Sequence, residues 1–379
     1  MTRKRINILT PPLEDQNVRA FLAPLLANRG LLSDAGFDLR LYRQIDAELT
    51  DCDILVLNSS YWRGPWAQHR TKAVDLITEL VERAPLTLFF DRASTSGTIT
   101  AAILPLVKRY YKTSLLRDRS LYLRPLYGLR QFTDYYHHND GVVDREPNWS
   151  DPIEEPNMLH KLRLSWSTAL ANYSLLGPRI SALYEHLPFA YFMRPSSNFI
   201  PPSLNRSIDV SCRMGLNYKY ETVGHQRRRL AEVLQKYRRV DRISKFAYFR
   251  ELRNSKIVTS PFGYSEVNYK DFETFISGGL LLKPDMSHLE TYPDLFQDDV
   301  TFVSHDWDLS NLEEKVDRIL SDYPRYLEIA ANGQDTYRSH TVGRDARERF
   351  VNYFLDLLDE AAVDDGETKA RSADGLNRA

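Results

Sequence analysis

The sequence lacks a cysteine framework, long apolar runs and an excess of charge of either sign. Only two of its 379 residues are cysteines, Cys52 and Cys212, and they stand far apart. Two separated cysteines make neither a disulfide framework nor a metal-binding motif, so we expect two small buried side chains in a reducing compartment.

Membrane-spanning and secretory features are also missing from the sequence. No stretch approaches the 18 apolar residues of a transmembrane helix, and the basic residues 1–6 lack the apolar core of a signal peptide. We therefore expect a cytoplasmic protein. Peripheral contact with the inner face of a membrane stays open, because a basic surface needs no hydrophobic anchor.

The charges balance almost completely, with 50 Lys and Arg against 51 Asp and Glu. A dedicated nucleic-acid binder normally carries a basic excess, so we expect no nucleic-acid partner. Hydrophobic residues make up 42% of the chain, which is typical of a globular protein with a substantial core. The length suggests two domains. The sequence does not indicate an oligomeric state.

Short apolar runs alternate with amphipathic stretches along the whole chain, which predicts α/β architecture with parallel sheets. In the first half we expect strands at 5–9, 37–42, 53–58 and 86–90, and helices at 18–35, 71–83, 101–116 and 159–176. Residues 188–205 contain several Pro, Ser and Asn residues and indicate a linker.

A second α/β series follows the linker. We expect strands at 207–213, 256–260, 280–283 and 300–303, and helices at 223–237, 248–254, 271–277, 312–322, 323–331 and 342–361. The predicted fold is two Rossmann-like domains facing across a cleft, over residues 1–195 and 206–341. Residues 342–361 form a last helix, and the polar residues 362–379 form a disordered tail.

The segment 252–295 carries the strongest chemical signal. A buried strand ends in Ser260-Pro261-Phe262-Gly263, and a polar loop then leads into a helix. Free N–H groups and the positive dipole at such a helix start favour an anionic phosphate. Glu273 lies one turn further on, where a carboxylate suits the two hydroxyls of a ribose. The alternative for Glu273 is a surface charge that pairs with Lys270 or Lys283.

This segment resembles the donor-binding motif of GT-B glycosyltransferases of the group-1 type. It is also similar to the C-terminal halves of exostosin-like and spore-coat-type glycosyltransferases. Gly263, Glu273, Gly278 and residues 280–282 fill the places of that motif, and Trp307-Asp308 before a helix fits its downstream pattern. The resemblance covers residues 250–340, while the N-terminal half agrees only in architecture.

One position departs from the pattern. Many group-1 members have two glutamates separated by seven residues, and the first of them falls on Ser265 here, with Glu266 one place late.

The resemblance implies an enzyme that moves a sugar, typically a hexose, from a nucleotide-sugar donor to a hydroxyl of a saccharide or glycolipid acceptor. It further implies a role in surface polysaccharide or glycoconjugate synthesis, and a last helix that returns to the first domain. The nucleotide-sugar is a substrate, so no cofactor is expected. No metal site is expected either, because Asp306 and Asp308 stand before a helix, where they suit capping.

Several residues are candidates for donor binding on the resemblance or on their position at strand ends. The predicted donor-binding residues are Arg213, Lys219, Gly263, Tyr264, Ser265, Glu266, Lys270, Glu273 and His288. Most of them could instead have a structural or surface role without a ligand. Arg213 could pair with a nearby acid, Lys270 could be a solvated helix residue, and His288 could simply be exposed. Gly278 fits an ordinary helix stop.

A general base would take the proton of the acceptor hydroxyl. Asp91, at the end of a first-domain strand, is the first candidate, and a turn carboxylate is its alternative. His137 and His138 are rival bases in an aromatic segment that could equally be packing surface. The basic run Gln226-Arg227-Arg228-Arg229 suits either a solvated helix face or an anionic partner.

Two other function classes stay open. The first is a nucleotide-sugar epimerase, whose product stays on the nucleotide. The second is a non-catalytic sugar- or nucleotide-binding relative in a polysaccharide assembly complex.

Overall fold

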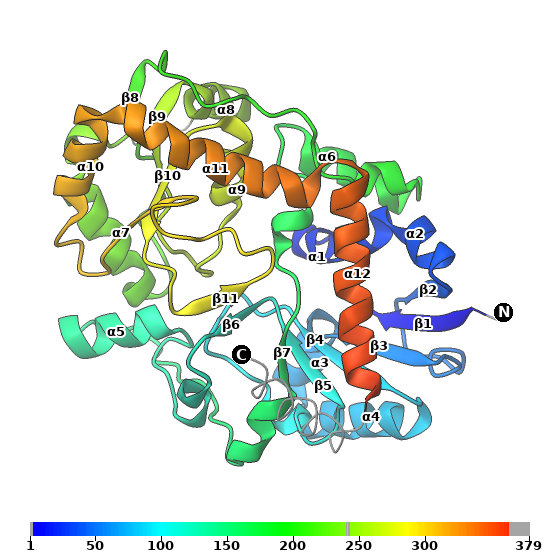
Figure 1. Cartoon of the computed structure of the whole chain (residues 1–379). Helices are drawn as coiled ribbons and strands as arrows, with labels where there is room; N and C mark the ends of the chain where they lie inside the picture. Colours follow the sequence, from blue (N-terminus) through cyan, green and yellow to red (C-terminus); the bar gives the residue numbers. More distant parts are fainter. Residues whose placement is uncertain (1–2, 240, 242, 364–379) are drawn as a thin grey trace, which may run out of the picture.

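The structure is a computed structural model, and it describes residues 3–239, 241 and 243–363. Two parallel sheets lie in the two halves of the chain, and helices pack around them (Figure 1). The predicted fold class, α/β with two parallel-sheet units facing across a cleft, is confirmed. Apart from Ala362 and Val363, the predicted tail 362–379 lies outside the described residues.

The first sheet has six strands in the order β2-β1-β3-β4-β5-β7, all parallel. Its strands are β1 (Lys4–Leu9), β2 (Phe37–Tyr42), β3 (Ile54–Asn58), β4 (Thr87–Asp91), β5 (Arg109–Lys112) and β7 (Leu162–Leu164). The helices of this unit are α1 (Gln16–Ala27), α2 (Arg29–Asp34), α3 (Arg63–Gln68), α4 (Arg70–Arg83), α5 (Gln131–Asp140) and α6 (Gly177–Ala182). Every residue of β3, β4 and β5 is buried, as is typical of central parallel strands.

Two of the expected helices are wrong, and a third is interrupted. Residues 101–116 contain a short 3₁₀ turn and then β5 and β6 (Ser114–Leu116). The buried strand β5 has no period-two pattern to distinguish it from a helix, because its charged ends are buried as well as its tyrosines. Residues 159–176 contain β7 and the 3₁₀ turn Thr168–Leu170. The helix expected at 18–35 divides into α1 and α2 at Asn28, whose side-chain amide donates to the carbonyl of Pro24.

The second sheet has four parallel strands in the order β12-β10-β9-β8. Its strands are β8 (Ile208–Ser211), β9 (Ser255–Thr259), β10 (Leu280–Pro284) and β12 (Val303–His305), and its helices are α7 (Glu221–Val233), α8 (Lys245–Asn254), α9 (Tyr269–Ser277), α10 (Leu312–Ser321) and α11 (Tyr323–Thr341). The strand expected at 300–303 begins three residues later, after a turn. The helix expected at 323–331 is ten residues longer. Gly278 ends α9 at φ +68°, which confirms the predicted helix stop.

The two units are packed tightly against each other. β6 of the first unit pairs antiparallel with β11 (Leu289–Thr291) of the second, and the sequence did not indicate this pairing. One hydrophobic core runs through both units, and Phe132 and Phe262 meet within it at 4.8 Å between ring centroids. A smaller core lies within the second unit alone.

The helix α12 (Gly343–Ala362) follows α11 and turns down along the first sheet (Figure 1). Phe350 and Phe354 place their rings edge-on against Trp166, at 5.3 and 5.7 Å between centroids. The Tyr111 hydroxyl donates to the carbonyl of Leu357 at 2.7 Å. Among the described residues, no helix combines the length and the apolar character needed to cross a bilayer.

Candidate functional site

A cleft of about 720 Å³ opens between the carboxyl ends of the two sheets. This edge is where open α/β sheets hold their ligands. The first unit contributes the start of α1, the loop after β4 and the 3₁₀ turn Thr168–Leu170. The second unit contributes the loop after β8, part of α7 and the loop that joins β9 to α9.

The loop between β9 and α9 is fixed by polar contacts around Asp271. Asn268 and Asp271 cap the start of α9 reciprocally, with the backbone N–H of Asn268 donating to the Asp271 carboxylate at 2.8 Å. The other oxygen of this carboxylate accepts from the Ser260 hydroxyl at 2.5 Å, and the carboxylate also pairs with the buried Lys283 ammonium at 3.2 Å. Burial lowers the pKa of Lys283, and the ion pair with Asp271 opposes this shift because it favours the charged ammonium. The helix start is therefore held rigidly at the cleft.

The same loop is also attached to the first unit. The Arg130 guanidinium donates twice to the carbonyl of Tyr264, at 2.9 and 2.7 Å. The Ser96 hydroxyl donates to the carboxyl of Glu266, which is fully buried. Burial raises the pKa of Glu266. The loop thus closes one wall of the cleft and bridges the two units.

Five basic side chains line the cleft. Its basic residues are Arg63, Arg92, Arg213, Arg227 and Lys270. Among the residues that the structure describes, no Asp, Glu or His lines it. Such a concentration of positive charge, held between low-dielectric walls, favours an anionic ligand.

The guanidinium groups of Arg92 and Arg227 are held in place by hydrogen bonds to uncharged groups. Arg92 donates to the Ser60 hydroxyl at 2.5 Å and to the carbonyl of Asn17 at 3.1 Å. Arg227 donates to the carbonyl of Phe262 at 2.6 Å, and its guanidinium lies 4.7 Å from the ring centre of Tyr218. Burial lowers the pKa of Arg92 to about 10 and also lowers the pKa of Arg227. Both side chains are more than 90% buried by accessible surface.

Lys270 completes this set from the first turn of α9. Its ammonium donates to the carbonyl of Arg213. Burial, and next the charge of Arg227, lower the pKa of Lys270 to about 8. Within the described part of the chain, none of Arg92, Arg227 and Lys270 forms an ion pair with a carboxylate. Arg92 and Arg227 are buried and Lys270 is partly buried, yet among the described residues they lack the counter-charge that buried cations normally have.

Comparisons with known proteins give only distant likenesses. No protein-family model and no curated protein matches the sequence. Among solved structures, HepE of Anabaena in complex with UDP-glucose has 9% identity and a TM-score of 0.43, over 94% of this chain and 100% of that chain. A glycosyltransferase from Rickettsia africae has 11% identity and a TM-score of 0.43, over 95% and 99%. A putative UDP-N-acetylglucosamine 2-epimerase from Listeria monocytogenes has 9% identity and a TM-score of 0.36, over 94% and 96%. At TM-scores below 0.5 these likenesses carry no functional argument, and the function has to be inferred from the cleft.

Five of the predicted donor-binding residues line the cleft, namely Arg213, Gly263, Tyr264, Ser265 and Lys270. A Cβ on Gly263 would stand 3.2 Å from the guanidinium of Arg227 and 3.3 Å from the Asn268 side chain, so the glycine permits a close approach. Arg213 also pairs with Glu251 at 2.7 Å, which is the alternative that the sequence left open.

The other predicted donor-binding residues do not line the cleft. Glu273 faces α8, where its carboxylate accepts from the Tyr248 hydroxyl at 3.0 Å, because α9 turns its side chain away from the cleft. Lys219 is exposed and pairs with Glu146 at 2.7 Å. His288 lies edge-on against Trp307 at 4.8 Å, and burial lowers its pKa to about 3. Glu266 is enclosed in the bridge to Ser96 described above.

The predicted bases also lie outside the cleft. The Asp91 carboxylate is buried and accepts from Lys112 at 3.0 Å and from the Tyr110 hydroxyl at 2.9 Å. His137 stacks on Tyr127 at 3.8 Å between ring centroids. His138 is exposed and contacts Asp134 at 3.4 Å. In this arrangement all three side chains serve packing or local ion pairs.

The sequence analysis did not predict that Arg63, Arg92 and Asn17 line the cleft. It named Arg227 only as part of a basic run and did not distinguish it from Arg228 and Arg229. Arg92 directly follows Asp91 at the end of β4. The sequence therefore indicated this strand end as part of the site, but Asp91 was chosen there instead of Arg92. On α7, Arg227 stands four residues after Val223 and three before Leu230, both of which are buried, and this helical spacing was a usable signal. Across the described residues, no cluster of three or more His, Cys, Asp or Glu side chains is placed to hold a metal ion.

Proposed function

We propose that the chain is a glycosyltransferase of the GT-B type that transfers a sugar from a nucleotide-sugar donor to a saccharide hydroxyl. The observation that carries this proposal is that Arg92, Arg227 and Lys270 line a cleft between two parallel sheets without a carboxylate partner among the described residues. A nucleoside diphosphate supplies the missing negative charge. The group-1, exostosin-like or spore-coat subtype and a role in polysaccharide synthesis remain predictions from the resemblance.

In this proposal each part of the site has a role. The diphosphate lies against Arg92, Arg227 and Lys270, beside the N-terminus of α9. The aromatic side chains of Tyr218, Tyr264 and Tyr269 in the wall offer faces for the base or the sugar. When the bond between the anomeric carbon and the phosphate oxygen breaks, negative charge grows on the diphosphate. The fixed cations stabilise that charge, so the reaction needs no metal ion for this purpose.

The proton of the acceptor hydroxyl also needs a destination. Since no carboxylate or imidazole lines the cleft within the described residues, the acceptor oxygen passes its proton to the departing phosphate oxygen. That transfer requires the acceptor to approach from the face that the diphosphate leaves. The sugar therefore keeps its anomeric configuration.

A thermal-shift panel tests donor binding. UDP, GDP, CMP, dTDP and ADP sugars are added separately, and a ligand at about 100 times its Kd should stabilise the folded protein by about 2.7 kcal/mol. Arg227→Gln should lose the shift. Arg228→Gln is the matched control, because the neighbouring Arg228 pairs with Glu221 outside the cleft. If no sugar nucleotide raises the melting temperature, the proposal is wrong.

A product assay separates the alternatives. Transfer releases a nucleoside diphosphate and joins the sugar to the acceptor, and it should continue in the presence of EDTA. An epimerase would return a changed sugar that is still attached to the nucleotide. A non-catalytic relative would give the thermal shift without any product.

A further inference from the structure

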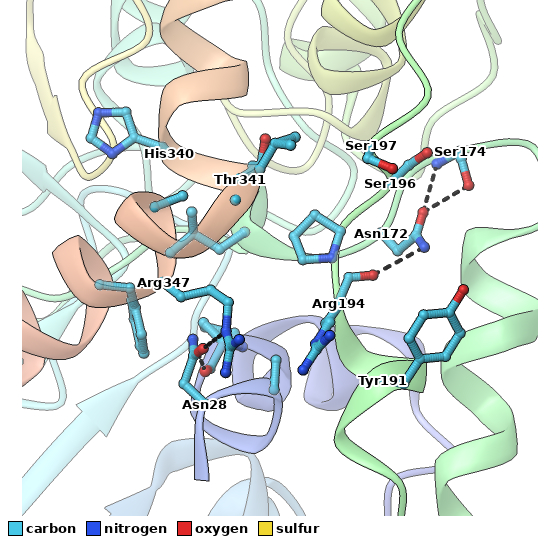
Figure 2. A pocket seen from close by; sticks show the side chains of 18 of the residues that line it. Asn28, Asn172, Ser174, Tyr191, Arg194, Ser196, Ser197, His340, Thr341 and Arg347 are labelled. Atoms are coloured by element: carbon cyan, nitrogen blue, oxygen red, sulfur yellow. Dashed lines mark hydrogen bonds between the residues drawn. The ribbon is translucent and has the colours of Figure 1, made fainter. Parts of the chain in front are cut away.

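A second cavity, of about 420 Å³, lies away from the cleft, where both connections between the two units pass (Figure 2). Its walls come from the end of α1, the linker residues 194–197 and the junction of α11 with α12. The apolar residues Leu170, Ile180 and Phe350 cover part of its surface. None of the proposed donor contacts reaches this cavity.

Two arginines face this cavity from different elements. Figure 2 shows Arg194 on the linker and Arg347 on α12 reaching toward the same region, with Asn28 beside Arg347. Among the described residues that line the cavity there is no Asp or Glu. Burial and then the charges of Arg194 and Arg344 lower the pKa of Arg347, so the arrangement favours an added negative charge.

The two guanidinium groups are presented differently. The Arg347 Nε donates to the side-chain oxygen of Asn28 at 2.8 Å, and Asn28 is fixed because its amide nitrogen donates to the carbonyl of Pro24. This orientation leaves the terminal nitrogens of Arg347 for a ligand. The guanidinium of Arg194 makes no hydrogen bond or ion pair with any described residue. Its backbone is held in place, because the Asn172 amide donates to the Arg194 carbonyl at 3.1 Å.

We propose that this cavity binds a phosphate ester, with the phosphate held between Arg194 and Arg347. A planar guanidinium group can donate two parallel hydrogen bonds to two oxygens of one phosphate. The start of α12 at Gly343 also lines the cavity, and its free N–H groups add to the attraction. The volume exceeds that of a bare phosphate, so the apolar wall contacts the organic part of the ester.

The ester can come from a soluble metabolite or from a lipid headgroup. The segment 176–191 beside the cavity bears on the lipid source. Five of its large apolar side chains are exposed by more than 40%, namely Leu176, Leu183, Leu187, Phe189 and Tyr191. Such side chains could enter the interface of a membrane while the headgroup occupies the cavity.

Hydrogen exchange measured by mass spectrometry tests the site on the full chain, with two probes. The soluble probe is glycerol 3-phosphate, and the lipid probe is phosphatidylcholine vesicles with or without phosphatidic acid. We expect slower exchange in the peptide that contains residues 343–347, either with glycerol 3-phosphate or with the phosphatidic acid vesicles alone. The first result identifies a soluble ligand, and the second identifies a lipid headgroup.

Variants assign the effect to the two arginines. Arg194→Gln should weaken binding at least tenfold and should fold normally, because its guanidinium makes no hydrogen bond or ion pair with a described residue. Arg347→Gln should act in the same way, and Arg344→Gln, whose side chain pairs with Glu348 at the surface, is the matched control. The proposal would be overturned if neither probe slows hydrogen exchange at residues 343–347. It would also be overturned if a probe slows this exchange as much in Arg194→Gln as in the wild type. Because the readout is at α12, failure of the cleft to bind nucleotide would not affect the result.

Discussion

Lys270 is the residue whose titration reports most directly on the cleft. Burial lowers its pKa to about 8, so in the free protein the ammonium loses its proton as the pH rises through about 8. A bound diphosphate favours the charged form. We therefore expect the affinity for the nucleoside diphosphate to be constant below pH 8 and to fall roughly tenfold per unit above it. Calorimetry between pH 7 and 9.5 measures this dependence.

Two variants act as controls for that titration. Lys270→Arg stays charged, so its binding should vary little over the same range. Glu273→Gln removes a carboxylate whose charge raises the pKa of Lys270, so the fall in affinity should begin at a lower pH. A wild-type affinity that stays level to pH 9.5 would show that Lys270 does not contact the ligand.

The sequence predicted the residues that line the cleft only where they lie close together in the chain. The loop that feeds α9 is contiguous, so Gly263, Ser265 and Lys270 could be chosen from the family resemblance and from their position between a strand end and a helix start. The sequence did not show which side of α9 faces the cleft. Glu273 lies on α9, but its side chain points to Tyr248 on α8. Arg92 and Arg227 come from distant elements, and their shared cleft depends on how the two units pack.

At the scale of the element, β3 and β4 were predicted as buried strands, whereas the equally buried β5 was mistaken for part of a helix. β5 carries a charge at each end and two tyrosines between them, and all four residues are buried. A strand that is covered on both faces loses the alternation by which strands are recognised. The β6–β11 pair joins three-residue strands that are more than 170 positions apart in the sequence, and no local pattern encodes such a partner.

The helix α12 gives a prediction about stability. Phe354 is buried against Trp166, so Phe354→Ala leaves a cavity and should lower the free energy of unfolding by about 3–5 kcal/mol. Denaturant unfolding followed by tryptophan fluorescence measures the loss. Asn352→Ala, on the exposed side of the same helix, should change it by less than about 0.5 kcal/mol. Equal effects of the two substitutions would mean that α12 does not pack as described.

At the scale of the whole molecule, the two units share one core and one antiparallel strand pair. We therefore expect cooperative unfolding in a single transition rather than one for each unit. Differential scanning calorimetry should give one endotherm whose calorimetric and van't Hoff enthalpies agree. Two separated endotherms would show that the interface between the units is weaker than its contacts indicate.

The gathering of cations in the cleft also has a consequence for the rate at which an anionic donor binds. Five of the 50 basic residues gather in the cleft, which leaves 45 against 51 acidic residues elsewhere. A molecule that is almost neutral overall therefore presents a positive entrance in a slightly negative exterior. An anionic donor is drawn inward over the last ~10 Å of its approach, and added salt shortens this range. In stopped-flow measurements the association rate should fall as salt rises, while the dissociation rate changes little.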